Sequence, residues 1–90
     1  MLLFAQNTGL LDAILLDEGR LTDIRTAAAG ALTVKRLAPK NIKSIGILGT
    51  GTQARQQLLQ CAKVLTCREL SIWGRNPENA EKYADFARSN

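Results

Sequence analysis

The stretch that decides the fold is Ser44–Ala54, S-I-G-I-L-G-T-G-T-Q-A, in which a short apolar run ends directly in a glycine turn. The residues that follow, Arg55–Val64, predict a helix. A dinucleotide site requires this order of strand, turn and helix: the first glycine allows the tight turn, and the second lets backbone approach a pyrophosphate. Gly49 and Gly51 take these roles, and Ala54 is small enough for close packing of helix and strand. We therefore expect phosphates to lie against free N–H groups at the positive end of a helix.

Length and composition bound the class of protein. The chain has 90 residues, which is one small domain or part of a larger one, because domains usually run to about 100–150 residues. A doubly wound nucleotide fold needs about six strands, so we expect only part of that fold here. No stretch approaches the roughly 20 apolar residues of a membrane span. Met1–Ala5 is apolar but has no basic n-region, and the polar residues Gln6, Asn7 and Asp12 soon follow it. These features predict no membrane segment, no signal peptide and, by default, a cytoplasmic location.

The net charge of +4 is modest and does not predict a nucleic-acid partner. A solvated helix end and the loop after it explain the cluster of cations at Lys35, Arg36, Lys40 and Lys43. No basic stripe with interleaved aromatic residues is present. The chain has no histidine, and the spacing of its two cysteines, Cys61 and Cys67, matches neither a zinc ribbon nor a redox pair. We predict two reduced thiols, no metal site and no imidazole chemistry.

Apolar runs and turn residues outline the other elements. Two short apolar runs, Leu2–Ala5 and Leu10–Leu16, flank a turn with Asn and Gly and predict a β-hairpin. Further along, the pattern predicts a helix over Leu21–Ala38 with Thr22 as N-cap, a strand over Ile42–Leu48, a helix over Thr52–Val64, a strand over Glu69–Trp73, and a last helix with Asn76 as N-cap and Pro77 at its first position. Strand, helix and strand at this length form a βαβ unit with parallel strands.

The helix before the glycine turn has unusually small side chains. It contains the run Ala27–Ala31, A-A-A-G-A, and helical spacing predicts an apolar stripe of Leu21, Ile24, Ala28, Ala31 and Leu32. A helix with so little side-chain volume can lie close against a neighbouring backbone or against a ligand. The sequence leaves both interpretations open, a close-packing helix or the wall of a site.

The tip of the strand after the glycine turn bears on which dinucleotide is preferred. A site for NAD usually places Asp or Glu there, where a carboxylate accepts hydrogen bonds from the ribose 2′-hydroxyl and repels a 2′-phosphate. This chain has Gly74-Arg75-Asn76 instead, and the guanidinium of Arg75 can pair with a phosphate and stack on adenine. We predict NADP(H) in preference to NAD(H), with a surface arginine in a loop as the alternative. Arg25, beside Thr26, is either an exposed helical arginine or a cation that faces the nicotinamide end of the cofactor and an acidic substrate.

Two longer segments resemble the ornithine cyclodeaminase and mu-crystallin family. One is Leu21–Ala31, L-T-D-I-R-T-A-A-A-G-A, which Leu37-Ala38-Pro39 follows; the other is Ile45–Arg55, I-G-I-L-G-T-G-T-Q-A-R. The resemblance continues through Ile72–Ala80 and covers nearly the whole chain. It implies an α/β fold in which residues 42–90 are the first βαβ portion of a Rossmann NAD(P)-binding domain. Residues 1–41 would then be a β-hairpin and helix from a substrate and dimerisation domain.

The resemblance also implies roles for single residues. Arg25 would bind the carboxylate of an amino-acid or cyclic imine substrate and lie beside the cofactor. Thr52 and Gln53 would contact the pyrophosphate, and the position of Gly74 or Arg75 would face the adenosine ribose. Members of the family that use NADPH carry an arginine like Arg75. The full set of expected cofactor-binding residues is Arg25, Thr26, Gly49, Gly51, Thr52, Gln53, Ala54, Gly74 and Arg75.

The chemistry implied by the resemblance is hydride transfer at the α-carbon of an amino acid or cyclic ketimine, by a cyclodeaminase or by a reductase, in a homodimer. The catalytic aspartate of the cyclodeaminases lies far downstream, and their substrate lysine and second arginine lie upstream. We therefore expect no catalytic residue within this chain, which resembles the middle of a family member. Two alternatives stay open: a cofactor-dependent binding protein of mu-crystallin type without turnover, and an inactive truncated fragment.

Overall fold

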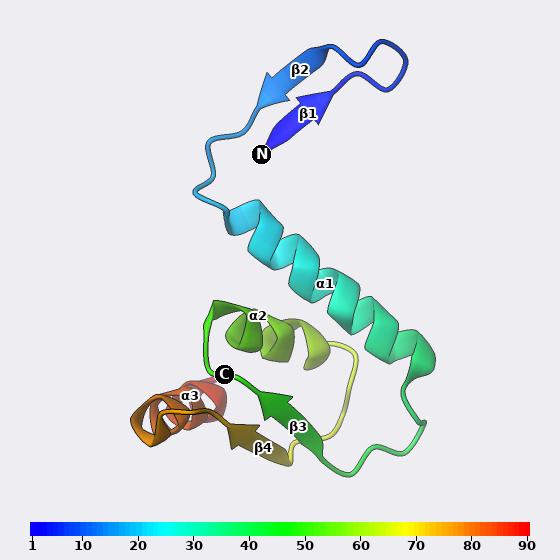
Figure 1. Cartoon of the computed structure of the whole chain (residues 1–90). Helices are drawn as coiled ribbons and strands as arrows, with labels where there is room; N and C mark the ends of the chain where they lie inside the picture. The colour runs from blue at the N-terminus through cyan, green and yellow to red at the C-terminus, as the bar shows by residue number, and fades with distance from the viewer.

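A computed structural model describes all 90 residues and shows an α/β chain (Figure 1). Its elements in order are β1 (Leu2–Phe4), β2 (Leu11–Ile14), α1 (Arg20–Leu37), β3 (Ile45–Leu48), α2 (Thr52–Cys61), β4 (Leu70–Trp73) and α3 (Pro77–Ser89). The predicted fold class is confirmed, since a hairpin and a helix precede a βαβ unit of Rossmann type. The strands and α2 are shorter than the sequence pattern indicated; β3 begins at Ile45 rather than Ile42, and α2 ends at Cys61 rather than Val64.

The βαβ unit places both strand ends at one edge. β3 and β4 pair in parallel, with Ile45 opposite Leu70 at the start and Leu48 opposite Trp73 at the end. The apolar side chains of Ile45, Leu70 and Ile72 face a cleft that α2 and α3 also line, so both helices cover that face of the sheet. The opposite face is bare: Leu48 is 84% exposed and Trp73 is 61% exposed.

Helix α1 packs closely on α2 through its small side chains. Ala27 and Ala31 are buried there, which confirms the close-packing interpretation of the alanine run. The predicted stripe is wrong in part, because Leu21, Ala28 and Leu32 are exposed. The face that contacts α2 follows the short residues at spacings of three and four, since only these let the two backbones approach.

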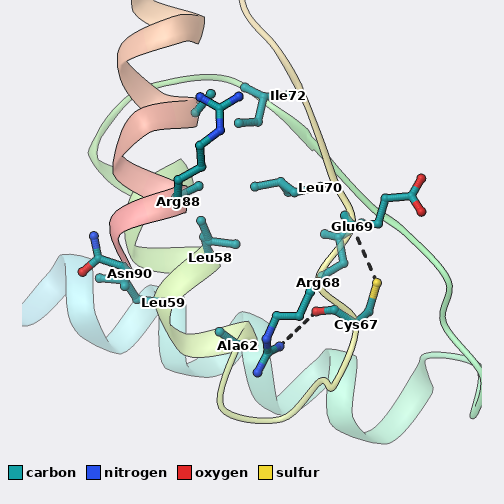
Figure 2. A pocket seen from close by; sticks show the side chains of 13 residues that line it. Leu58, Leu59, Ala62, Cys67, Arg68, Glu69, Leu70, Ile72, Arg88 and Asn90 are labelled. Atoms are coloured by element: carbon teal, nitrogen blue, oxygen red, sulfur yellow. Dashed lines mark hydrogen bonds between the residues drawn. The ribbon is translucent and has the colours of Figure 1, made fainter.

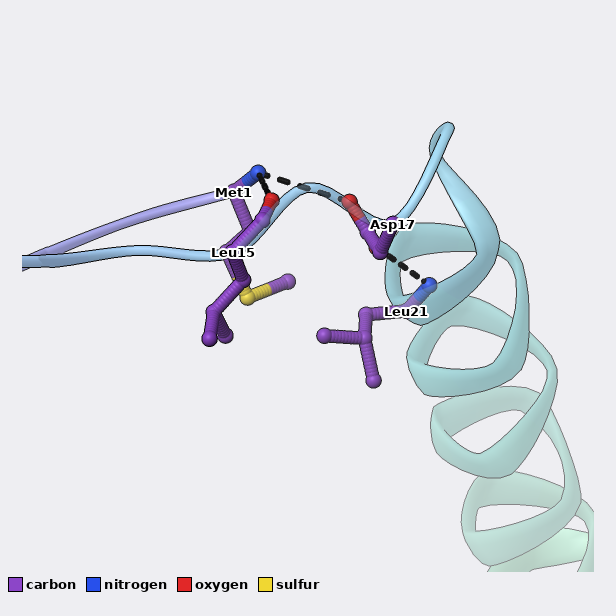
Figure 3. Close-up of polar contacts among 4 residues, drawn as sticks. All are labelled: Met1, Leu15, Asp17 and Leu21. Atoms are coloured by element: carbon purple, nitrogen blue, oxygen red, sulfur yellow. Dashed lines mark hydrogen bonds and ion pairs between the residues drawn. The ribbon is translucent and has the colours of Figure 1, made fainter.

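The start of α1 is held by Asp17 and not by the expected cap Thr22, which lies within the helix. The Asp17 carboxylate accepts a hydrogen bond of 2.7 Å from the backbone N–H of Leu21, and this bond holds the pKa of Asp17 below its usual value (Figure 3). The amino group of Met1 lies 3.5 Å from the same carboxylate and donates to the carbonyl of Leu15. An aspartate four residues before a helical N–H thus replaces the predicted threonine cap.

Helix α3 is tied to the start of α2. Asn76 caps it as predicted, since its side chain accepts a hydrogen bond of 2.9 Å from Glu78 N–H, and Pro77 occupies the first turn. Tyr83 is completely buried and donates a hydrogen bond of 2.8 Å to the carbonyl of Ala54 in the first turn of α2. α3 therefore fixes the helix that follows the glycine turn.

The N-terminal hairpin stands apart from the rest of the molecule (Figure 1). β1 and β2 pair antiparallel, as predicted, with a register shift between Leu3 and Phe4. Its apolar side chains are largely exposed, and the whole chain has a radius of gyration of 16.3 Å, against about 12 Å for a compact chain of this length. Three residues of 90 are buried, namely Ala27, Ala31 and Tyr83. The well-packed part of the molecule is therefore the contact of α2 with α1 and α3.

Candidate functional site

The glycine turn has the backbone that its sequence predicts. Gly49 has φ of +119°, a conformation that side chains with a Cβ rarely adopt, and its N–H bonds to the carbonyl of Trp73 at 2.8 Å. Gly51 has an ordinary φ of −82°, and a Cβ built on it would meet nothing within 4 Å. The fold itself therefore demands glycine only at the first position. At the second, the missing Cβ leaves open space in front of the turn.

The first turn of α2 presents free backbone donors to that space. The first backbone bond of the helix runs from Arg55 N–H to the Gly51 carbonyl, and no side chain caps the helix. The N–H groups of Thr52, Gln53 and Ala54 are thus without partners. Uncapped donors and the helix dipole favour an anion such as a pyrophosphate at this place. The residues present therefore fit the phosphates of a dinucleotide.

A cleft of about 420 Å³ lies beside the turn, at the carboxyl ends of β3 and β4. This is where open α/β sheets bind ligands. Four of its residues, Gly49, Thr50, Gly74 and Arg75, come from the glycine turn and from the strand tip that the sequence singled out. The sequence pattern did not indicate a ligand contact for the other lining residues, which are Leu48, Trp73, Asn76 and Asn79. Asn79 could have been found from its spacing, because it lies one turn after the cap Asn76.

Arg75 is the only charged residue that lines the cleft. Its side chain is exposed and takes part in no ion pair or hydrogen bond of the structure, and no carboxylate faces the cleft. Gly74, just before it, lies against Thr50 of the glycine turn: a Cβ at Gly74 would come within 2.7 Å of Thr50 Cγ2. The strand tip and the turn are therefore in contact, and the cation stands free beside them.

The other predicted residues lie on the α1 side of the turn. Arg25 is exposed on the first half of α1 and has no acidic partner. Thr26 is half-buried, and its carbonyl accepts a hydrogen bond from Gln57. The side chain of Gln53 bonds to Asp23 of α1, so the group that Gln53 presents to the open space is its backbone N–H. Arg25 and Arg75 thus belong to different elements on the two sides of the turn.

A second, apolar cleft of about 340 Å³ lies between the sheet and the helices α2 and α3 (Figure 2). It includes Leu58, Leu59 and Leu70, together with Arg68 and Cys67 near the start of β4. Its position at the amino ends of the strands is opposite to the edge where α/β sheets bind ligands. Incomplete packing between sheet and helices explains this cleft.

Titratable groups away from the turn add no further site. Both cysteines are free thiols, as predicted; burial raises the pKa of Cys61, and the Cys67 thiol donates to the Lys43 carbonyl at 2.8 Å. No three His, Cys, Asp or Glu side chains are grouped so that they could hold a metal ion. None of the helices combines the length and apolar character needed to cross a bilayer.

Known proteins match this chain over nearly its whole length. The family model described as ornithine cyclodeaminase/mu-crystallin family matches residues 1–90. An uncharacterized cyclodeaminase of Sinorhizobium fredii is 46% identical over 81 residues, which are 90% of this chain and 24% of that protein. Iminosuccinate reductase of Paracoccus denitrificans is 38% identical over 85 residues, which are 94% of this chain and 26% of that protein.

A solved structure shares the fold as well. The Δ1-pyrroline-2-carboxylate reductase of Thermococcus litoralis, in complex with NADH and L-proline, superposes with a TM-score of 0.82 at 35% identity, over 98% of this chain and 27% of that one. The chain thus spans about a quarter of the length of the relatives that it matches. With a family model that matches from the first residue to the last, the chain belongs to the ornithine cyclodeaminase/mu-crystallin family.

Proposed function

We propose that residues 42–90 are the first part of an NADP(H)-binding domain, in which the pyrophosphate lies at the start of α2 and the ribose 2′-phosphate lies at Arg75. The observation that carries the proposal is the turn Gly49–Gly51 with its three free N–H groups, next to a cleft at the carboxyl ends of two parallel strands. Gly51 supports it, because no packing inside the protein requires a glycine there.

The preference for the phosphorylated cofactor is supported by Arg75. A guanidinium with no carboxylate nearby attracts the two negative charges of a 2′-phosphate, and neither Asp nor Glu is present in the cleft to accept from a 2′-hydroxyl. The Thermococcus litoralis relative was solved with NADH, so the preference for NADP(H) is carried by Arg75 alone.

The single tryptophan gives a direct test, because Trp73 lines the cleft next to Gly74. Titration of its fluorescence with NADPH and with NADH is expected to give a dissociation constant about tenfold lower for NADPH, which is about 1.4 kcal/mol. Arg75→Ala should remove this difference by weakening NADPH alone. Arg36→Ala, an exposed arginine without a partner at the end of α1, lowers the net charge equally and should change neither affinity. Tighter binding of NADH by the unaltered chain contradicts the proposal.

The reaction that we propose for the protein carrying this segment is hydride transfer at the α-carbon of an amino acid or cyclic imine, by a reductase or cyclodeaminase. Bound cofactor supplies or accepts the hydride. Arg25, an exposed cation on α1, would bind the substrate carboxylate and so orient the α-carbon. Residues 1–41 would belong to a substrate and dimerisation domain of a homodimer, which the exposed apolar hairpin supports. A cytoplasmic location of that protein is part of the same proposal.

A chimera tests this reaction. Residues 1–90 replace the matching segment of the Thermococcus litoralis reductase, whose backbone they share closely. The chimera is expected to reduce Δ1-pyrroline-2-carboxylate with oxidation of NADPH, and Arg25→Ala is expected to raise the KM for this acid at least about tenfold. A chimera that binds NADPH but shows no turnover would favour the binding-protein alternative. An Arg25→Ala chimera with unchanged KM would refute the role of Arg25.

A further inference from the structure

Two glutamines of α2 connect the phosphate turn to the helix that carries Arg25. Gln53 Nε2 donates to the carbonyl oxygen of Asp23 at 3.3 Å and to its carboxylate Oδ1 at 3.0 Å. One helical turn later, Gln57 Nε2 donates to the carbonyl oxygen of Thr26 at 3.4 Å. These are the hydrogen bonds between α1 and α2, and their acceptors lie on both sides of Arg25 in the sequence.

The interface is shaped to admit these amides. Ala27 and Ala31 are buried between the helices, so the backbones approach closely enough for a glutamine side chain to reach a carbonyl of the neighbouring helix. Gly30 completes the space, because a Cβ built there would overlap the Gln57 amide oxygen. Small residues on α1 and glutamines four apart on α2 are therefore complementary.

The amide of Gln53 can take only one orientation. Both atoms that face its nitrogen, the carbonyl and the carboxylate of Asp23, are hydrogen-bond acceptors, so a flipped amide would place three acceptors together. In the observed orientation Gln53 Oε1 is buried and has no partner. A contact that served burial alone would be more stable with an apolar side chain, since an unpaired buried polar atom costs free energy. A polar group retained at such a cost is typical of a residue that fixes one register between two elements.

We propose that Gln53 and Gln57 are positioning residues that fix the register of α1 on α2, and thereby the place of Arg25 relative to the phosphate turn. This inference rests on the proposed function, because it assigns the contact a purpose only if Arg25 and the turn serve one ligand. The adenosine end of the site, with Arg75 and Asn76, lies in the loop between β4 and α3 and does not include the α1–α2 contact. The nicotinamide end depends on α1.

The test compares a whole dinucleotide with its adenosine end. Trp73 fluorescence is titrated with NADPH and with adenosine 2′,5′-bisphosphate for the unaltered chain and for Gln53→Met, which keeps the shape but removes both hydrogen bonds. We expect NADPH to bind about tenfold more weakly to the variant and the bisphosphate to change by less than about twofold. A merely structural role would weaken both ligands in parallel. Gln56→Met, on the same helix with no side-chain hydrogen bond, is the matched control and should change neither.

A rescue experiment tests the hydrogen bond between the side chains of Gln53 and Asp23 directly. Gln53→Glu sets a carboxylate against that of Asp23 and should weaken NADPH at least as much as Gln53→Met. Adding Asp23→Asn supplies an amide donor to the new carboxylate and should restore most of the affinity. Parallel loss for both ligands, no change in Gln53→Met, or no rescue in the double variant each overturns the inference. If the unaltered chain binds neither ligand, the proposed function itself fails, which these titrations reveal separately.

Discussion

Tyr83 offers the sharpest test of how the phosphate helix is held, because it is the only tyrosine and its exposed fraction is 0%. Its hydroxyl donates to the Ala54 carbonyl at 2.8 Å. Tyr83→Phe removes this bond, but the carbonyl keeps the ladder bond of α2, so no acceptor is left unpaired. The expected loss is therefore about 1 kcal/mol, the net value of one hydrogen bond, and not the ~3 kcal/mol of a stranded polar group.

Urea unfolding followed by circular dichroism measures this loss. With a slope of about 1 kcal/mol per molar urea for a chain this small, the midpoint should fall by roughly 1 M. Ser89→Ala is the matched control, because Ser89 also donates its hydroxyl to a helical carbonyl, that of Asp85 at 3.0 Å, but in an exposed position. Ser89→Ala should leave the free energy of unfolding almost unchanged. Equal midpoints for Tyr83→Phe and the unaltered chain, or an equal loss in both variants, would refute the reasoning.

The same residue predicts a dependence on alkaline pH. Burial raises the pKa of Tyr83 above its usual value of 10.0, so the unfolded chain loses this proton at a lower pH than the folded one. The stability that neutral Tyr83 contributes is complete below about pH 10 and is lost as pH rises through the folded pKa. The free energy of unfolding should fall more steeply above pH 10 in the unaltered chain than in Tyr83→Phe, and the absorbance of tyrosinate reports the titration directly. Parallel curves would contradict the prediction.

Substitutions at Gly49, Gly74 and Asp17 test other parts of the fold. Gly49→Ala should cost about 1–2 kcal/mol in thermal unfolding because its φ is +119°, whereas Gly46→Ala, with open space and an ordinary φ, should cost less. Gly74→Ala should lower the free energy of unfolding by about 1–3 kcal/mol because its Cβ would crowd Thr50 Cγ2. Thr50→Ser removes that methyl group, so the double variant should be more stable than Gly74→Ala alone. A double variant that is no more stable would count against the contact. A backbone N–H of α1 lowers the pKa of Asp17, so the ionised carboxylate stabilises the folded chain above its usual pKa of 3.8. This stability is lost as the pH falls through the pKa of the folded state. Asp17→Asn should therefore lose less helix signal on acidification than the unaltered chain.

The parts of the fold that followed from the sequence are those set by local rules. Gly49 and Gly51 after an apolar run predicted the turn, and Asn76-Pro77 predicted the start of α3, because backbone conformation and capping depend on a few neighbouring residues. Gly74 and Arg75, which the sequence places at the strand tip, line the cleft beside the turn. The volume of this cleft and the presence of Asn79 in its lining could not be predicted from the sequence, because both depend on how α3 packs beside the turn.

The predictions that were wrong concern the cap of α1 and its buried face, where several side chains compete for the same contact. Thr22 is a residue type that often caps helices. In the structure Asp17 accepts the hydrogen bond from the N–H of Leu21, and the helix begins at Arg20, before Thr22. The stripe on α1 was predicted from hydrophobicity, whereas the contact with α2 selected the smallest residues and left Leu32 57% exposed. The distance between the two helix backbones decides which side chains can pack at their interface. The hydrophobic pattern of one helix does not predict this distance.

The contact between Gly74 and Thr50 constrains how this site can evolve. A residue with a Cβ at position 74 would need the space that Thr50 Cγ2 fills, 2.7 Å away. In an alignment of the family we expect the two positions to vary together: glycine before the arginine where the turn carries a threonine or a larger residue, and a larger residue there where the turn carries alanine, serine or glycine. A lineage that enlarges the strand tip to read a different ribose would pass most easily through a smaller residue in the turn.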